Sequence, residues 1–495
     1  MDTKRRQLLR IAAAGVGMGF AASPLEALAC RPTTPAKPNH LLIDVHCHIF
    51  NADDLAVRGF ANHIFMHTSG RGVLNIGNWL SQMVDWLGQL SAPGIRTETR
   101  LLESILTGRV DPYDAYCRVE HPHGGILAQA SNYRLHNALA MMALYPETDL
   151  FVPAMVDMDA HLGDQALVTP RQQVDLMEYI FVITGGRFHG YAAFDPLRQV
   201  RYDEKRPNGR DSPLSPLRIV KRAVMEQGFV GIKLYPPMGF RPIGNAALDG
   251  CKGINPRAPK YDAVLRELFD WCAAERVPVI THCNDSNHAN VHDSENSECQ
   301  HVGSPRQWAQ LYESHPEYRG HLKVDLGHFG RADMHSRNRL KLLDAERENW
   351  PNAPDLARQH AEDMKEAAGF IAAMAAHPES LFADLSNYDT LDTDRLRKAF
   401  SKDMREMIAA HPHLARQLMY GTDWFMTPQG AVPYLDNMRD ALPPDRHGPF
   451  YGANAARFLG LRRGEATRRR LEAFYRKWGI ADPDWFQRVD STPAG

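Results

Sequence analysis

The 495-residue sequence has few cysteines, almost no net charge and no long apolar run beyond its N-terminus. Seven cysteines are too few for a disulfide scaffold in so long a chain. A formal net charge of -2 leaves no polybasic surface, which argues against a nucleic-acid partner. No later run approaches the roughly 18 apolar residues of a membrane span, so we expect no transmembrane segment in the mature chain.

What the sequence does contain is a large apolar fraction and many histidines. Apolar side chains make up 44% of the chain, which excludes a wholly disordered protein and suits a large buried core. The 23 histidines outnumber both the 16 tyrosines and the 20 phenylalanines. Histidine is the commonest metal ligand and the usual acid or base near neutral pH, so the positions of these residues carry the functional argument.

The first 29 residues have the pattern of an export signal. A basic cluster at residues 4–6 precedes an apolar run at 11–22, which is too short to cross a bilayer but suits a signal peptide. An Ala-Leu-Ala cleavage site follows at 27–29, and the paired arginines resemble a twin-arginine signal. We therefore expect a signal peptide over 1–29 and an exported, periplasmic protein; lipid anchoring at Cys30 is the less favoured alternative.

A proline-rich linker at 30–40 leads into eight short apolar runs that are separated by helical patterns. Strands that alternate with helices pair in parallel, and eight such units predict an α/β fold, the (β/α)8 TIM barrel. The predicted strands are 41–50, 150–157, 188–194, 230–235, 277–282, 321–328, 381–385 and 418–423.

Two connections are much longer than ordinary loops. The first insertion, 51–149, follows strand one and carries helical patterns, and the second separates strand six from strand seven. Insertions of this length on a barrel usually cover the catalytic face, so 51–149 is a candidate cap. We assign 41–465 to the barrel and 466–495 to a C-terminal extension.

Histidine and aspartate lie at the predicted C-terminal ends of these strands, where barrel enzymes place their active sites. His46 and His48 are two residues apart on strand one and therefore share a face. His282, His328 and Asp423 end the fifth, sixth and eighth strands. A single strand-end histidine is more often an ordinary polar residue than a ligand, but imidazoles grouped with a carboxylate suit zinc or a related divalent metal.

Six segments, in this order along the chain, resemble a known family. They are DVHCHIFN (44–51), GFVGIKLYPP (228–237), VPVITHCND (277–285), LKVDLGHFG (322–330), LMYGTDWF (418–425) and YGANAARFLGL (451–461). They span essentially the whole mature chain and resemble the amidohydrolase superfamily of metal-dependent barrel enzymes. The most similar branch holds aminocarboxymuconate-semialdehyde decarboxylase, the resorcylate decarboxylases and small lactonases.

The resemblance implies a role for each strand-end residue. His46, His48 and His282 correspond to metal ligands, and Asp423 corresponds to a ligand or an acid/base. His328 corresponds to a ligand of a second metal in binuclear members and to an acid/base in mononuclear ones.

Lys233 ends strand four, where some members bridge two metals through a carboxylated lysine. That carbamate requires a partly neutral amine, which burial favours. The alternative is a cationic anchor for a substrate carboxylate. We expect one divalent ion, Zn²⁺ by preference, with a two-metal site that includes Lys233 and His328 as the alternative.

Residues beside the predicted ligands have simpler explanations. Cys47 and Cys283 have the opposite strand parity and should face the surrounding helices. Asp44 shares the parity of His46 and either orients a ligand or is an ordinary polar residue at the start of a strand.

Other candidates lie in the loops. Arg58 and Tyr235 could contact substrate, although both residue types are common. The polar loop 284–301 either shapes the pocket or is merely solvated. Cys251 and Cys299 could pair in an oxidising compartment, which the sequence alone does not decide.

Together these residues predict a metal-dependent hydrolase acting on an amide, lactone or ester of a small molecule. Asp423 would move the proton of water to the leaving group, and His328 would stabilise the developing oxyanion. The first alternative is a lyase that decarboxylates an aromatic or unsaturated acid, with His328 or Asp423 protonating the carbon. The second is a catalytically inactive exported binding protein. A homo-oligomer is compatible with the sequence.

Overall fold

The structure is a computed structural model. It describes residues 37–56, 92–117, 129–251, 253–283, 299, 302–388, 391, 393–424, 426 and 434–493. The predicted signal peptide, Cys30, Arg58 and most of the loop 284–301 lie outside the described residues.

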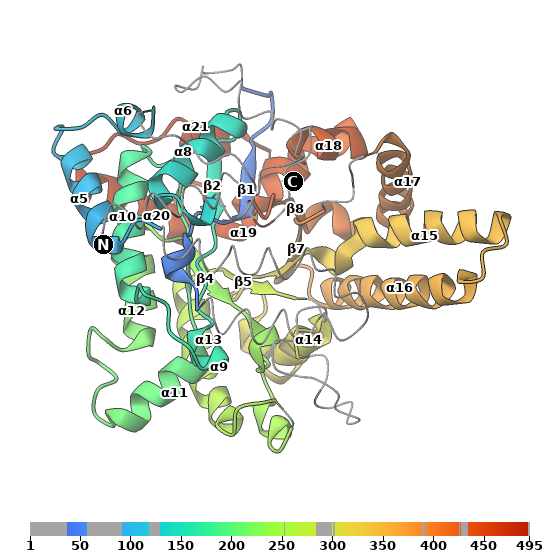
Figure 1. The fold of residues 1–495 in the computed structure, drawn as a ribbon, viewed down its shortest axis with the longest axis horizontal. Helices are drawn as coiled ribbons and strands as arrows, with labels where there is room; N and C mark the ends of the chain where they lie inside the picture. The colour runs from blue at the N-terminus through green and yellow to red at the C-terminus, as the bar shows by residue number, and fades with distance from the viewer. Residues whose placement is uncertain are drawn as a thin grey trace, which may run out of the picture.

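Eight short parallel strands, each within the run predicted for it, form the centre of the molecule (Figure 1). They are β1 (Ile43–Cys47), β2 (Leu150–Pro153), β3 (Tyr191–Ala193), β4 (Gly231–Leu234), β5 (Val279–His282), β6 (Val324–Gly327), β7 (Leu381–Leu385) and β8 (Leu418–Tyr420). β1 pairs with β2, and β3 to β8 pair in sequence order. All eight are buried, as expected for a parallel sheet covered by helices.

A few backbone hydrogen bonds connect the two-stranded and the six-stranded sheets at two irregular seams. Between β2 and β3, isolated bridges join Phe151 to Phe188 and Ala154 to Tyr191. Between β8 and β1, the N–H of Asp423 donates to the carbonyl of His46 at 2.7 Å. The predicted (β/α)8 barrel is therefore confirmed.

The seam between β8 and β1 also depends on Asp44 and Gly421. The carboxylate of Asp44 accepts the Thr422 hydroxyl at 2.6 Å and the backbone N–H of His46 at 3.2 Å. A Cβ atom on Gly421 would lie only 2.9 Å from the Cβ of His46, so the approach of the two strands requires glycine. Asp44 thus fixes the start of the β1 segment that carries the two histidines.

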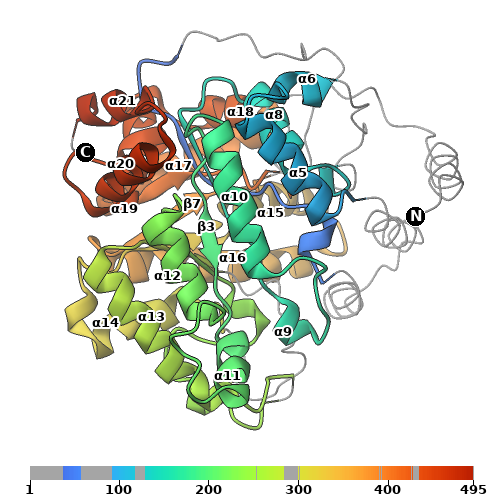
Figure 2. The same ribbon diagram turned by 90° about the vertical axis from the view of Figure 1, so that its left-hand side faces the viewer.

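Helices surround the ring, and Figure 2 shows α10 and α12 in front of β3. They are α5 (Ile95–Leu106), α6 (Pro112–Cys117), α8 (Arg134–Leu144), α9 (Asp159–Leu162), α10 (Pro170–Ile183), α11 (Pro196–Lys205), α12 (Pro216–Glu226), α13 (Tyr261–Glu275), α14 (Pro305–Ser314), α15 (Ala332–Arg347), α16 (Ala353–Ala376), α17 (Asp394–Ala410), α18 (Tyr434–Ala441), α19 (Asn454–Leu459), α20 (Ala466–Trp478) and α21 (Trp485–Ser491). Their apolar faces and the strands form one continuous core.

The described part of the first insertion packs on the side of the barrel. α8 connects β1 to β2 as a barrel helix, and α5 lies against α10. Arg134, fully buried at the start of α8, binds Asp54 at 2.6 Å and Glu98 at 2.6 Å. This ion-pair network ties the loop after β1 to both helices. The predicted cap stays a prediction, because residues 57–91 and 118–128 lie outside the described part.

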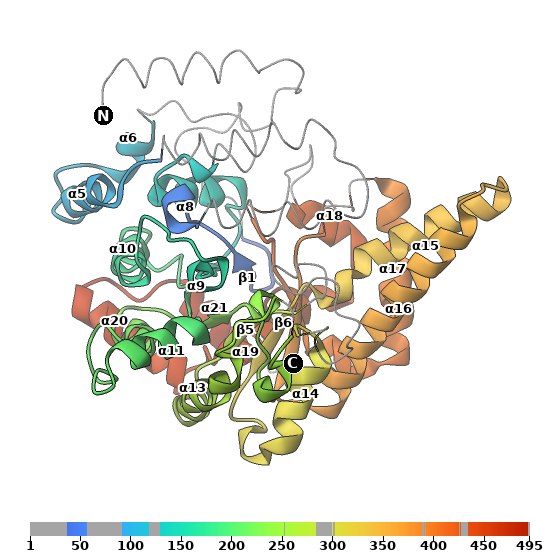
Figure 3. The same cartoon turned by 60° about the horizontal axis from the view of Figure 1, so that its bottom comes forward.

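The second insertion is a helical hairpin. α15 and α16 pack against each other and extend away from the barrel (Figures 1 and 3). α16 also contacts α14, so it is a lengthened barrel helix with α15 added before it. The hairpin projects sideways, and the expectation that this insertion covers the catalytic face is not met by these two helices.

The C-terminal extension is part of the barrel core. His189, just before β3, contacts the Tyr475 hydroxyl of α20 at 2.5 Å and the carbonyl of Gly228 at 2.7 Å. The indole N–H of Trp485 in α21 donates to the carbonyl of Gly186 at 2.9 Å. Because these partners precede β3 and β4, the extension covers the end of the barrel opposite the strand-end histidines.

The cysteines and the hydropathy of the helices also bear on the sequence predictions. Cys251 and Cys299 form a disulfide, while Cys47, Cys272 and Cys283 are free and buried. None of the helices in the described ranges has the length and hydropathy needed to span a membrane.

The buried His189 predicts an acid-sensitive contribution to stability. Burial lowers the pKa of His189 to about 4, against about 6.5 for an exposed histidine. The unfolded chain therefore takes up this proton first, and stability falls by up to about 3 kcal/mol as the pH drops from 6.5 to 4. We expect His189→Gln to be less stable at pH 7.5 but to have a shallower acid dependence, measured by urea unfolding at pH 7.5 and 4.5.

His321→Gln is the matched control, because His321 is exposed at the same end of the barrel. Its acid dependence should equal that of the wild type. An unchanged slope in His189→Gln would show that His189 does not contribute.

Candidate metal centre

Three of the predicted ligands meet where β1 and β8 end. The Oδ1 atom of Asp423 lies 3.0 Å from Nε2 of His48 and 3.8 Å from Nε2 of His46. All three side chains are buried, and one donor atom from each lies within 4.8 Å of the others. Two imidazole nitrogens and a carboxylate oxygen in this arrangement can hold a divalent cation.

Asp423 supplies the negative charge of this cluster. It follows β8 in a left-handed backbone conformation with φ of 54°, held by its hydrogen bond to His46. Burial alone would raise the pKa of Asp423, but the hydrogen bond with His48 and the neighbouring imidazoles hold it below its usual range. The group is therefore a carboxylate at neutral pH.

The two histidines of β1 are oriented through their other ring nitrogens. Nδ1 of His46 lies 3.0 Å from Oδ2 of Asp384, and Nδ1 of His48 lies 2.8 Å from the carbonyl of Ala154. Both partners are acceptors, so each Nδ1 donates and each Nε2 is directed towards Asp423, where a bound cation would take the place of the proton in the His48–Asp423 hydrogen bond. Metal-binding histidines are typically oriented in this way.

Asp384 on β7 is a site residue that the sequence reasoning missed. Its Oδ2 atom holds His46, and its Oδ1 accepts the backbone N–H of His328 at 3.2 Å. Burial opposes the charge, but His46 holds the pKa of Asp384 below its ordinary value. A charged residue inside the apolar run LFADL was the available signal, because a buried carboxylate needs a partner.

His282 and His328 form a second pair beside the cluster. Nδ1 of His282 lies 3.1 Å from Nε2 of His328, and the His328 ring lies 4.9 Å from that of His46. His282 does not belong to the three-residue cluster. Its Nε2 is buried and has no hydrogen-bond partner among the described residues, which leaves one donor atom open.

Both rings of this pair are neutral at neutral pH. Burial lowers the pKa of His328 to about 4 and that of His282 well below its ordinary value. Tyr235 stacks on His282 with ring centroids 4.5 Å apart, so this residue, which the sequence offered only as one that could contact substrate, lies at the site. It also packs on a small apolar cluster formed by Ala56, Leu162 and Met238.

Lys233 reaches the centre from β4. Its Nζ lies 3.3 Å from Nε2 of His46, and the side chain is buried. Burial lowers the pKa of Lys233 to about 8, although Asp384 and Asp423 oppose the shift. The amine therefore remains mainly an ammonium at pH 7 and has a larger neutral fraction than an exposed lysine.

A second group of donor atoms, from His46, His328 and Asp384, is also compact. Asp384 meets His46 at Nδ1, and hydrogen bonds already occupy that side of the ring. A cation there would have to displace them. The geometry therefore favours one ion, on the Nε2 side of His46.

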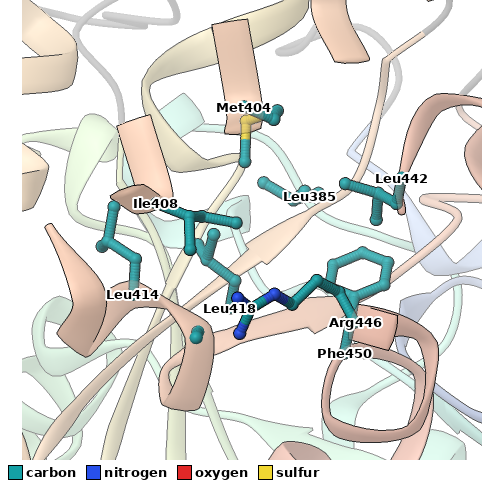
Figure 4. A pocket seen from close by; sticks show the side chains of 9 residues that line it. Leu385, Met404, Ile408, Leu414, Leu418, Leu442, Arg446 and Phe450 are labelled. Atoms are coloured by element: carbon teal, nitrogen blue, oxygen red, sulfur yellow. The ribbon is translucent and has the colours of Figure 1, made fainter. Parts of the chain in front are cut away.

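The remaining candidates lie away from the centre. Cys47 is buried in the core, and the Cys283 thiol donates to the carbonyl of Gly303 at 3.0 Å, in agreement with their predicted strand parity. Figure 4 shows an apolar cavity between α17, α18 and the outer side of β7 and β8. No metal-centre residue lines it.

Comparison with known proteins gives a family and several similar structures. The model of the amidohydrolase family matches residues 207–461, just over half of the chain. No curated protein matches. Among solved structures, 5-carboxyvanillate decarboxylase from Sphingomonas paucimobilis is 16% identical with a TM-score of 0.37, covering 65% of this chain and 81% of its own.

Two further solved structures are similar to the chain. The 5-carboxyvanillate decarboxylase from Novosphingobium aromaticivorans, complexed with manganese, is 13% identical with a TM-score of 0.40, covering 88% of this chain and 99% of its own. A putative 2-pyrone-4,6-dicarboxylic acid hydrolase from Pseudomonas putida is 12% identical with a TM-score of 0.35, covering 65% and 86%. By the family match, this chain belongs to the amidohydrolase family of metal-dependent barrel enzymes.

Proposed function

We propose that the protein hydrolyses an amide, lactone or ester bond of a small molecule with the help of a divalent cation. The observation that supports this proposal is the Asp423 carboxylate, held ionised 3.0 Å from His48 at the mouth of the barrel. A buried carboxylate in this position can accept a proton from water next to a bound cation.

We further propose His46, His48 and Asp423 as ligands, with the open Nε2 of His282 as the fourth donor. This set of three imidazoles and one carboxylate suits Zn²⁺, which we prefer over manganese. A divalent cation supplies Lewis acidity, which polarises a carbonyl group and makes water more acidic.

The residues of the chain have the following roles in this proposal. Asp423 takes the proton of the attacking water at a carboxylate oxygen and delivers it to the leaving group. The ammonium of Lys233 faces the same space and stabilises negative charge on the substrate oxygen. His328 was expected to do so, but its Nε2 lies against His282, which makes Lys233 the better placed donor.

Decarboxylation of an aromatic or unsaturated acid is the second candidate, and Lys233 is the observation that favours it. Lys233 is a buried ammonium two residues before Tyr235, which packs on the apolar cluster, and this combination suits an organic carboxylate. Lys233 could also protonate the carbon that loses CO2, since both histidines of the second pair are neutral. This reaction consumes no water: the carbon–carboxylate bond breaks, CO2 leaves, and the carbon takes up the proton to give the second product.

We also propose that the chain is exported. The signal pattern over 1–29 and the disulfide between Cys251 and Cys299 both suit an oxidising compartment.

Metal content should depend on the β1 histidines. We expect about one ion per purified chain and a loss of at least about tenfold in metal affinity for His46→Ala or His48→Ala, because each removes a ligand. Elemental analysis by plasma mass spectrometry measures both. His321→Ala, an exposed histidine, should bind as the wild type does. Well under one ion per chain, with no loss in His46→Ala, would instead support the inactive binding protein.

Asp423→Asn should lower kcat/KM by about 10²–10⁴-fold, because the amide cannot accept the proton. The measurement uses a panel of lactones, esters, amides and aromatic acids in ¹⁸O-labelled water, with product analysis by mass spectrometry. Incorporation of ¹⁸O supports hydrolysis. Release of CO2 without ¹⁸O in the product would overturn hydrolysis in favour of decarboxylation.

Export should depend on the paired arginines. We expect the double variant Arg5→Lys, Arg6→Lys to remain unprocessed in the cytoplasm, because the export pathway recognises the two arginines together. Cell fractionation and N-terminal sequencing test this, with cleavage expected near Cys30. An unprocessed wild-type chain found only in the cytoplasm would contradict it.

A further inference from the structure

The end of the barrel opposite the metal centre carries a group of basic side chains. Arg276, Lys323 and Arg416 come just before β5, β6 and β8, so they lie where the strands begin. Four arginines from α19, α20 and the turn between these helices join them. The group, which we call the basic end surface, consists of Arg276, Lys323, Arg416, Arg457, Arg462, Arg469 and Arg470.

The basic end surface is continuous, because contacts connect residues from different elements. The ammonium of Lys323 donates to the carbonyl of Arg457, and the guanidinium of Arg457 donates to the carbonyl of Arg416. Arg470 donates at 2.8 Å to the last carbonyl of α13, directly before Arg276. Segments far apart in the sequence therefore place their positive charges side by side.

The arginines of this surface donate to main-chain carbonyls and not to carboxylates. Arg276 and Arg462 each donate to a carbonyl at 2.9 Å, and Arg469 donates to another. None of the seven basic side chains forms an ion pair with a carboxylate in the described ranges. Arg468, in the same segment, shows the contrast, since it pairs with Glu472 at 3.0 Å. A carbonyl satisfies the N–H groups but leaves the positive charge uncompensated.

The surface has a net positive charge at neutral pH. Three carboxylates lie near it without pairing with it, namely Glu275, Glu379 and Glu465. Burial lowers the pKa of Arg470 only to about 10, so this group stays charged. A net charge of -2 over the whole chain therefore does not exclude a basic surface at one end, contrary to the expectation from the sequence.

We propose that the basic end surface attaches the protein to a membrane through anionic phospholipid headgroups. Guanidinium groups bind phosphate through paired hydrogen bonds, and clusters of basic side chains bind anionic bilayers. Because the surface lies where the strands begin, attachment leaves the metal centre open to solution at the other end.

Lipid is favoured over nucleic acid because the proposed export takes the chain to a compartment bounded by membranes. This choice alone rests on the export proposal. The attachment itself is independent of the reaction that the metal centre carries out.

Binding to vesicles tests the proposal. The purified chain, in its naturally processed form, is sedimented with vesicles of phosphatidylcholine alone or of phosphatidylcholine with phosphatidylglycerol. We expect binding to the anionic vesicles only. Addition of NaCl should weaken it, because salt screens exposed charges.

The double variant Arg416→Gln, Arg469→Gln should bind the anionic vesicles about 25-fold more weakly, because each basic side chain at a charged bilayer contributes about fivefold. Both arginines are exposed, so the fold should tolerate the change. The double variant Arg416→Lys, Arg469→Lys keeps both charges and should bind within about threefold of the wild type.

The matched control is the double variant Arg218→Gln, Arg306→Gln. Both arginines are exposed and lie in the first turns of α12 and α14, at the end of the barrel that holds the metal centre. The control changes the net charge by the same amount and should leave vesicle binding unchanged. Far-UV circular dichroism and the unfolding temperature show which variants fold.

Three outcomes would overturn the proposal. The first is equal binding of the wild type to neutral and anionic vesicles, and the second is an equal loss in the control variant. The third is binding to a DNA duplex without binding to anionic vesicles, which would assign the surface to a nucleic acid. None of them depends on turnover or on cell fractionation, so failure of the hydrolase or export proposal would remain distinguishable.

Discussion

The seam between β8 and β1 is the constraint on which the site depends. Regular pairing stops there, and the backbone bond from Asp423 to His46 brings the last strand against the first. Gly421 permits the close approach of the two strands. The carboxyl group of Asp44 accepts hydrogen bonds from the Thr422 hydroxyl and from the backbone N–H of His46. Two histidines near the start of the chain and an aspartate near its end become neighbours only because the barrel closes at this point.

Much of this arrangement could be predicted from sequence, because strand ends are local features. The apolar runs located all eight strands, and the alternation of His46 and His48 along β1 indicated a shared face. Asp423 followed from its place at the end of the eighth run. What these residues share is that their strand position alone determines where they lie.

The features that were missed depend on pairs that are distant in sequence. Asp384 hydrogen-bonds His46, which lies 338 residues away in the sequence, and nothing in the sequence of its own strand indicates that partner. The pairing of His282 with His328 depends on how two rings turn, which strand position does not determine. The disulfide, left open by the sequence, required the loops after β4 and β5 to meet.

Charge balance shows why a cation suits this interior. Burial raises the pKa of Asp325 well above its ordinary value and that of Asp44 to about 7. The carboxyl groups of the centre that are fully ionised at neutral pH are therefore Asp384 and Asp423, and the ammonium of Lys233 lies beside them. Burial lowers the pKa of His46, His282 and His328 below the ordinary value, so these three rings are neutral at neutral pH. A divalent ion would neutralise the charge of these two carboxylates and, together with Lys233, favour anionic substrates or transition states.

The contact of α20 with His189 has a consequence for how the chain acquires its fold. The imidazole of His189, just before β3, contacts the hydroxyl of Tyr475, which is synthesised 286 residues later. Until then, α20 and α21 do not cover the aromatic side chains at that end of the barrel. The nascent chain would need protection from aggregation. The protein can complete its core only after synthesis is almost finished.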